Sequence, residues 1–310
     1  DSRQSRGLGD VYKRQAYTAL ATIMSASAAH ADLSIAGFHK GVLSSGDNTT
    51  GMSNTFTTSS VYVTYGTTLD NGMGLSANYS ITDASMGFSA SIDTGMGSLA
   101  FGTVHKSAVD AFDSMPAGAT EITSNTGLGS YVDGDAAEGN GIRYTSPSIN
   151  GWTVGYSMGE NECSSVVTYG ATDGDNSTAT TCNDDRMASF AVKGSIAGVA
   201  LAAGSVDDID GKDDSFFTVG YSVAGVSLGY GRYDDDDGSE ATVVGLSTSM
   251  AGLSLGYTYE ENDASTDTDL SRYNVSKDLG GMAVTLQYTD TDDGTAVDNQ
   301  NWDLVYTIGF

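Results

Sequence analysis

The sequence has few basic residues, few prolines and no long apolar run, and each shortage removes a class of protein. Its 13 Lys and Arg residues stand against 40 Asp and Glu, giving a formal net charge of -27. A nucleic-acid backbone would repel such a chain, so nucleic acid is not an expected partner. Only 2 of the 310 residues are proline, which excludes a collagen-like or proline-rich chain. No stretch of about 18 apolar residues occurs, so no helical membrane span is expected.

Charged residues and histidines are also scarce for a soluble enzyme. Charged residues make up 17% of the chain, against about 25% in ordinary soluble domains. The three histidines are His30, His39 and His105. A hydrolase triad needs a His that is oriented by a carboxylate and lies beside an activated Ser, and the abundant serines of this chain give no such indication. Neither glycine fingerprint for nucleotides is present. We therefore predict that the chain is not an enzyme and requires no cofactor.

The first 31 residues are expected to lie outside the folded domain. Residues 1–15 (DSRQSRGLGDVYKRQ) resemble a translated sequencing adapter and are treated as a non-native segment. Residues 16–31 (AYTALATIMSASAAHA) form a small-residue apolar run that ends in an A-x-A cleavage pattern, which is typical of a signal peptide. The alternative for this run is a short buried helix. The predicted mature domain is residues 32–310, exported from the cytoplasm.

The two cysteines, Cys163 and Cys182, lie in a stretch rich in Asn, Asp, Ser, Thr and Gly. An even pair in an exported protein predicts a disulfide. Closing a loop of about 20 residues contributes roughly 3 kcal/mol in the chain-entropy model. Two free thiols or a metal pair are the alternatives, but two ligands do not make a zinc site.

Apolar residues alternate with small or polar residues along the whole mature chain, as the last ten residues illustrate. There, Trp302, Leu304, Tyr306 and Ile308 share one parity, and the residues between them are small, polar or short. Successive side chains of a strand point to opposite faces, so each such segment is a strand with one apolar face. That face either packs on a second sheet or faces lipid, while the polar face lines water.

The connections between these strands favour the second explanation. Short glycine turns such as Ala197-Gly198, Ala224-Gly225 and Ala251-Gly252 alternate with long acidic connections. Short turns at one rim and long loops at the other are typical of a membrane barrel. We predict an all-β fold, a 16-stranded antiparallel transmembrane β-barrel. The predicted strands start at Leu33, Phe56, Met73, Met86, Ser98, Gly139, Trp152, Arg186, Val199, Ser215, Val226, Glu240, Leu253, Leu270, Met282 and Asn301.

One connection, residues 105–138, is far longer than the others and shows no alternation. A connection of this length is usually functional or disordered. In a barrel wide enough to hold an aqueous channel, a third option is that it folds inward and narrows the lumen.

The chain resembles a general-diffusion porin of the Gram-negative outer membrane, of the alphaproteobacterial type. The resemblance covers residues 32–310 and rests on the terminal YTIGF, the hairpin VYVTYGTTLDNGMGLSANYS (residues 61–80), the long fifth-to-sixth connection and the repeated AG and GG turns. It implies a homotrimer of barrels, each with a water-filled pore for small hydrophilic solutes and ions, set in outer-membrane lipid and lipopolysaccharide. The alternative is a structural or adhesive barrel, or a secreted acidic β-rich protein, without channel activity.

The resemblance also implies a constriction loop whose acids face a basic wall across the pore. The acids of the long connection are Asp110, Asp113, Glu121, Asp133, Asp135 and Glu138. The bases on the expected lumen parity are Lys40, Lys106, Arg143, Lys193 and Arg272. Avoidance of lipid alone would place bases on this parity, because a base at mid-depth costs about 2–4 kcal/mol, so parity by itself does not establish function. With acidic mouths and a nearly balanced constriction, we expect weak cation selectivity.

The acidic loops have two interpretations. They are either solvated surface or sites for Ca²⁺, which takes carboxylate oxygens and would bridge the barrel to anionic lipopolysaccharide. The spacing does not match an EF-hand loop, so a structural Ca²⁺ is a hypothesis only. Its candidate ligands are Asp207, Asp208, Asp210, Asp234, Asp235 and Asp236.

Overall fold

A computed structural model describes most of the predicted mature domain. The described residues are 32–46, 53–82, 86–102, 107–112, 116–119, 141–160, 164–169, 176–181, 186–207, 213–234, 240–263, 268–292, 294 and 299–310. Within these residues, no helix has both the length and the apolar character needed to cross a membrane.

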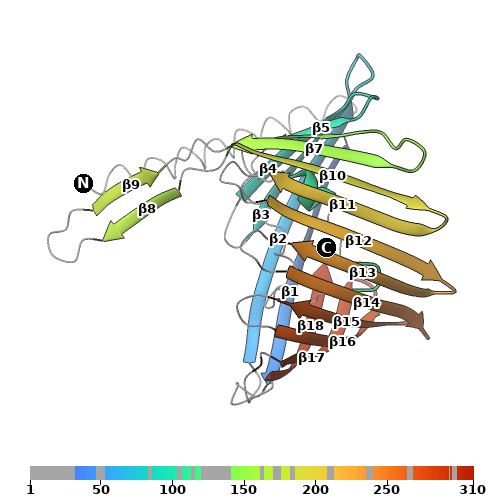
Figure 1. The fold of residues 1–310 in the computed structure, drawn as a ribbon. Coiled ribbons are helices and arrows are strands. Elements are labelled where there is room, and N and C mark those ends of the chain that lie inside the picture. Colours follow the sequence, from blue (N-terminus) through green and yellow to red (C-terminus); the bar gives the residue numbers. More distant parts are fainter. Residues whose placement is uncertain are drawn as a thin grey trace.

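Sixteen of the described strands close into one antiparallel barrel, which confirms the predicted fold (Figure 1). Each strand pairs with its neighbours in sequence, except that β7 pairs with β10, and β1 pairs with β18 to close the ring. The barrel strands are β1 (Asp32–Gly46), β2 (Ser53–Thr68), β3 (Gly74–Thr82), β4 (Met86–Asp93), β5 (Ser98–Gly102), β6 (Ile142–Thr145), β7 (Thr153–Glu160), β10 (Arg186–Ile196), β11 (Val199–Asp207), β12 (Asp213–Val223), β13 (Val226–Asp234), β14 (Glu240–Met250), β15 (Leu253–Asn262), β16 (Thr268–Asp278), β17 (Met282–Asp292) and β18 (Asn299–Gly309).

Several strands begin at positions that differ from the prediction. β2 begins at Ser53 rather than Phe56, and β18 begins at Asn299 rather than Asn301. The extra residues are polar, and backbone pairing continues through them because a ladder of N–H and C=O groups does not depend on an apolar side chain. β6 begins at Ile142, whereas Gly139 had been expected, and is only 4 residues long.

Tight turns such as residues 197–198, 224–225 and 251–252 join the strands at one rim, called here the turn rim, and the opposite ends of the strands form the second rim, called the loop rim (Figure 1). In three of these turns an alanine also lies in the left-handed region: Ala197, Ala224 and Ala251 have φ of 50°, 50° and 54°. Each is followed by a glycine with φ between 75° and 84°. Two successive residues with positive φ define the turn whose twist matches a β-hairpin. Left-handed alanine costs about 1 kcal/mol, which the flanking ladder offsets.

A two-stranded sheet, β8 (Ser164–Tyr169) and β9 (Asn176–Thr181), lies outside the barrel order. It occupies the connection between β7 and β10, which the sequence predicts as one of the long acidic connections. Figure 1 shows this hairpin projecting away from the barrel at the loop rim. The Thr and Val residues of these two strands favour an extended backbone.

The apolar parity of the strands faces outward, so of the two explanations for the alternation the barrel takes the lipid-facing one. Phe217, Tyr221 and Leu228 are between 43% and 47% exposed on the outer face. On the opposite parity, polar residues such as Asn274 and Gln287 are buried. Across β15 to β18 the outer face carries a row of contacting aromatic rings, from Tyr257 through Tyr273 and Tyr288 to Trp302. Such rows are typical of the interfacial girdles of membrane barrels.

Candidate pore and constriction

A short helix, α2 (Ala108–Phe112), lies inside the barrel and contacts β6, β7, β10 and β11. It belongs to the long connection between β5 and β6. A second described piece of the same connection, residues 116–119, also lies against the inner wall. The expectation that this connection folds inward is therefore confirmed for its described parts. We call residues 107–112 and 116–119 the constriction segment.

The start of α2 is bound by two serines of the wall. Ser157 on β7 and Ser189 on β10 face each other in the register, and their hydroxyl oxygens are 2.6 Å apart. The Ala108 N–H donates to both hydroxyl oxygens at 2.9 Å, and the Val109 N–H donates to Ser189 at 3.4 Å. The first N–H groups of a helix have no partner within the helix, and here the wall supplies their acceptors.

The remainder of α2 packs on the positions next to this serine pair. A Cβ atom added to Gly155 would lie 2.8 Å from the Phe112 ring and 3.3 Å from the Ala108 side chain. Glycine at this position is therefore what allows the helix to approach the wall. On the next lumen-facing position of β10, the Lys193 ammonium lies 4.6 Å from the centre of the Phe112 ring, which is a cation–π distance.

Residues 116–119 form a turn that crosses a row of glycines. The Ala119 N–H donates to the Pro116 carbonyl at 2.9 Å, and Gly118 has a φ of 88° that favours glycine. The row below it consists of register partners on β12, β13 and β14, namely Gly220, Gly229 and Gly245. A Cβ atom on Gly245 would lie 2.6 Å from the Ala119 Cα and 2.7 Å from the Gly118 carbonyl carbon. The turn therefore lies in a backbone groove of the wall.

Between the two contact regions, an apolar cluster lies against the inner face of β10 to β14. Val109 and Phe112 of α2 are 0% and 2% exposed, and they belong to one buried cluster with side chains of β10 to β14. Its wall members are Ala191, Ala202, Val206, Phe216, Tyr233, Ala241 and Val243. These wall residues stand on the lumen parity, where the alternation rule predicts polar side chains. Their apolar character follows from the constriction segment that covers them.

The opposite wall, formed by β2 to β6, is open and rich in hydroxyl groups. A cavity of about 480 Å³ is lined there by Thr64, Ser76, Asn78, Ser89, Ser91 and Arg143, with Ala111 of α2 on its other side. The Ser76 and Ser91 hydroxyls are 2.7 Å apart and face each other across β3 and β4. Toward the turn rim a second cavity of about 500 Å³ shares Ser76 and Ser91 and includes Asp32 and Asp93.

The predicted basic wall divides into different environments. Lys40 is half-buried and stands opposite Thr307 on the lumen parity, as expected. Arg143 is also half-buried, lines the open passage and donates from Nη1 to the Ser107 carbonyl at 3.4 Å. Lys193 lies over Phe112 on the covered wall. Lys106 falls outside the described residues.

Arg272 lies on the lumen parity, as expected, but its side chain is buried in an ion pair. It is 1% exposed, and its Nη1 lies 3.3 Å from Oε2 of Glu260, a buried residue on the neighbouring strand β15. Sequence reasoning missed Glu260, because the residue that stands directly opposite Arg272 on β15 is Thr258. Glu260 lies two residues after Thr258 and therefore points to the same face of the sheet. A compensated pair contributes much less field to the pore than a lone charge does.

Most of the predicted acidic residues of the pore lie outside the described residues. Asp110 is within α2, but its side chain is not described, and Asp113, Glu121, Asp133, Asp135 and Glu138 fall outside altogether. Cys163 and Cys182 do so as well.

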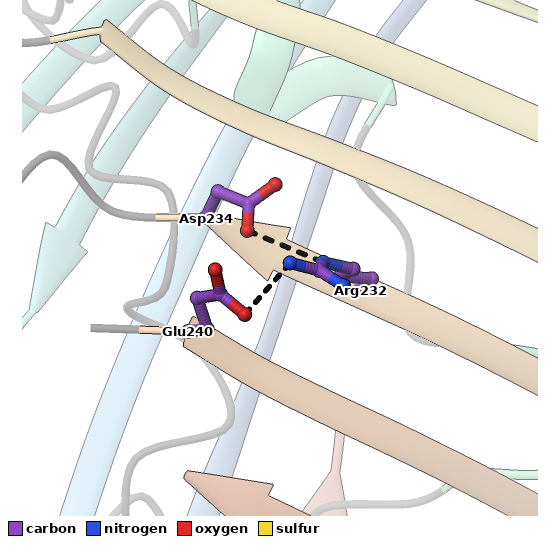
Figure 2. Close-up of polar contacts among 3 residues, drawn as sticks. All are labelled: Arg232, Asp234 and Glu240. Atoms are coloured by element: carbon purple, nitrogen blue, oxygen red, sulfur yellow. Dashed lines mark hydrogen bonds and ion pairs between the residues drawn. The ribbon is translucent and has the colours of Figure 1, made fainter. Parts of the chain in front are cut away.

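Of the candidate Ca²⁺ ligands, only the side chain of Asp234 is described. It accepts from Arg232 Nε at 3.3 Å, and Arg232 Nη2 reaches Glu240 Oε2 at 2.7 Å. Figure 2 shows the guanidinium directed at both carboxylates, at the ends of β13 and β14 on the loop rim. Asp207 is described in its backbone alone, and Asp208, Asp210, Asp235 and Asp236 fall outside the described part.

Three comparisons with known proteins were made. A family model described as Gram-negative porin matches residues 16–249. No curated protein sequence is significantly similar to the chain.

Among solved structures, a triple mutant of the Rhodopseudomonas blastica porin is similar with a TM-score of 0.62 and 17% identity, covering 90% of this chain and 100% of that one. OmpT, an outer-membrane protein of Vibrio cholerae solved in a trimer form, is similar with a TM-score of 0.64 and 15% identity. The match covers 90% of this chain and 99% of OmpT. An anion-selective porin from Comamonas acidovorans is similar with a TM-score of 0.60 and 11% identity. The match covers 91% of this chain and 100% of that porin.

Proposed function

The chain belongs to the Gram-negative porins, and from this premise we propose which part of its lumen conducts and what passes. It is an outer-membrane β-barrel that forms a water-filled channel. We infer that solutes pass along the open wall of β2 to β6, between that wall and α2. The passage serves small hydrophilic solutes and ions by passive diffusion, without enzymatic chemistry.

One observation carries this proposal: the two sides of the lumen differ in how they are occupied. On the wall of β10 to β14, the constriction segment covers an apolar cluster, and the smaller cavity that remains there, about 410 Å³, is bordered by Pro116 and Ala117 of that segment. The wall of β2 to β6 carries hydroxyls, Asn78 and Arg143 around a cavity of about 480 Å³. Groups that hydrogen-bond water keep such a passage wet and lower the cost of moving a polar solute through it.

The experiment is reconstitution of the mature chain into planar bilayers and liposomes. We expect stepwise openings in KCl and swelling of liposomes in small sugars, with a rate that falls steeply as sugar size increases. A barrel that inserts, as judged by heat-modifiable migration on gels, yet gives no conductance steps would support the structural or adhesive alternative.

We further propose weak cation selectivity and a homotrimeric assembly. Formal net charge of -27 supports an excess of cations at the mouths. The trimer is supported by family membership and by the trimer form in which the Vibrio cholerae protein was solved. Chemical cross-linking in detergent tests the assembly, and a ladder that stops at two copies would contradict it.

Two smaller proposals concern the loop rim. We propose that Cys163 and Cys182 are disulfide-bonded, supported by the pairing of their sequence neighbours Ser164 and Thr181 in β8 and β9. A thiol reagent should then label the protein only after reduction. We also propose that carboxylates of the acidic loops contact lipopolysaccharide through divalent ions, so that chelation reduces the lipopolysaccharide retained on purification.

A further inference from the structure

The first N–H groups of helix α2 are bound by residues that are distant in the sequence. Its first carbonyl acceptor is that of Ser107, which takes the Ala111 N–H at 3.1 Å. The next two N–H groups, those of Ala108 and Val109, donate to hydroxyls that are 49, 81 and 80 residues away in the sequence. An N-terminal helix group is normally capped by a side chain of the same turn. Here the cap comes from two strands of the barrel wall.

We propose that Ser157 and Ser189 form a clamp that positions the constriction segment and thereby sets the conductance of the pore. This inference rests on the proposed function of the lumen and adds two positioning residues to it. The serines do not line the open cavity themselves. They act through α2, whose far side does line it.

The burial of the clamp explains why its hydroxyls matter. Ser157 and Ser189 are 0% and 2% exposed, and Ala108 and Val109 are both fully buried. A buried N–H without an acceptor carries the full cost of its lost hydration. Removing both hydroxyls therefore leaves α2 with two buried donors that water can satisfy only if the helix moves away from the wall.

Movement of α2 would reach the passage directly. Ala111 lines the open cavity opposite Ser76, Ser91 and Arg143. Arg143 also donates to the Ser107 carbonyl at 3.4 Å, next to the clamped turn. Helix α2 therefore lies between the clamp and the passage, and a shift of the helix changes the width of the passage.

The test compares two serine pairs of the same wall geometry. The double variant Ser157→Ala/Ser189→Ala removes the clamp. The matched control Ser222→Ala/Ser227→Ala removes another cross-strand register pair, on β12 and β13, whose hydroxyls are 2.8 Å apart and which lines neither cavity of the open wall. Both are reconstituted in planar bilayers after confirming heat-modifiable migration equal to that of the unmodified protein.

We expect the clamp variant to spend about tenfold more time in altered conductance levels than the unmodified protein, with increased open-channel noise, since losing about 1.4 kcal/mol shifts a two-state equilibrium tenfold. The control should keep one dominant level. Each single variant should show a smaller effect, because the Ala108 N–H retains one acceptor.

A clamp variant with the unmodified conductance and noise would overturn the proposal, as would equal changes in the control. If the clamp variant does not fold, the pair Ser157→Thr/Ser189→Thr, which keeps both hydroxyls, should restore the single dominant level. An unmodified protein that never conducts would instead contradict the proposed function and not the clamp, so the two failures can be distinguished.

Discussion

The two sides of the lumen are built from strands of the same pattern but serve opposite purposes. On the wall of β10 to β14, most of the lumen-facing positions that carry the constriction segment are apolar or glycine, beside the polar Ser189, Lys193 and Thr218. On the wall of β2 to β6, the same parity holds Ser, Thr and Asn around an open cavity. One wall binds the chain that narrows the pore, and the other wall faces the solute.

This difference shows that the lumen parity of a barrel need not be uniformly polar. Burial of apolar surface contributes about 25 cal/mol per Å², whether the surface lies in a core or inside a barrel. A segment that folds inward therefore creates a local core, and the wall beneath it carries mostly apolar side chains or glycine. Glycine at Gly220, Gly229 and Gly245 gives the closest approach.

The largest expected effect comes from filling the glycine groove. Gly245→Val would place its side chain into the backbone of Gly118 and Ala119, and overpacking of this kind costs about 1–3 kcal/mol. Gly66→Val is the matched control, because a Cβ atom at Gly66 on the open wall meets nothing within 4 Å. We expect Gly245→Val to lower the unfolding midpoint in detergent and to alter single-channel conductance.

The control variant should keep its unfolding midpoint, since valine suits a strand better than glycine does. A lower midpoint for Gly66→Val than for Gly245→Val would contradict the division of the lumen into a covered and an open wall.

The next effect concerns the two bases on the two walls. Arg143 borders the open passage, whereas Lys193 lies over Phe112 on the covered wall. We expect Arg143→Gln to raise the permeability ratio of K⁺ to Cl⁻ by about twofold in dilute KCl, because the substitution removes a fixed positive charge from the wall of the passage. Lys193→Gln should change the ratio less. The measurement is the reversal potential across a KCl gradient.

Salt provides the control for this prediction. The Debye length falls from about 10 Å at 0.1 M to about 3 Å at 1 M, so the difference between Arg143→Gln and the unmodified protein should shrink as salt is raised. A larger change for Lys193→Gln would mean that ions follow the covered wall.

The acids of the constriction segment should act in the opposite direction. The double variant Asp110→Asn/Asp113→Asn removes two negative charges near α2, and we expect a modest fall in the K⁺ to Cl⁻ permeability ratio. Reversal potentials measured beside those of Arg143→Gln test the sign. A rise in the ratio would show that these acids do not face the conducting passage.

The sequence was sufficient for the barrel because its signals are local. Alternation and tight turns are each contained within a few residues, and together they predict sixteen strands that close into an antiparallel barrel. The interior was harder, because its contacts join distant segments. Nothing in the local sequence around Ser157 or Ser189 indicates that they bind Ala108.

Some interior signals were present but unused. Gly220, Gly229 and Gly245 lie in the middle of strands, where glycine indicates a close backbone approach, yet glycine was interpreted only in turns. Apolar Phe216 and Val243 on the lumen parity also indicate a covering segment. To pair Arg272 with Glu260, one must know the register between β15 and β16. Alternation of apolar and polar residues does not fix that register.

The smallest expected effect on conduction is that of the Arg272 and Glu260 pair, which sharpens the contrast with Arg143. Both side chains are buried and 3.3 Å apart, at 1% and 4% side-chain exposure. Removing one partner leaves a buried charge and costs about 3–5 kcal/mol, so Arg272→Gln alone should lower the unfolding midpoint. The double variant Arg272→Gln/Glu260→Gln removes equal and opposite charges, so its stability should recover much of the loss. Its reversal potential should equal that of the unmodified protein, because a compensated pair acts on the passage only through a short-range dipole. A shift as large as that of Arg143→Gln would mean that Arg272 acts on permeating ions as a separate charge, and that the basic wall extends to β16 as the sequence had suggested.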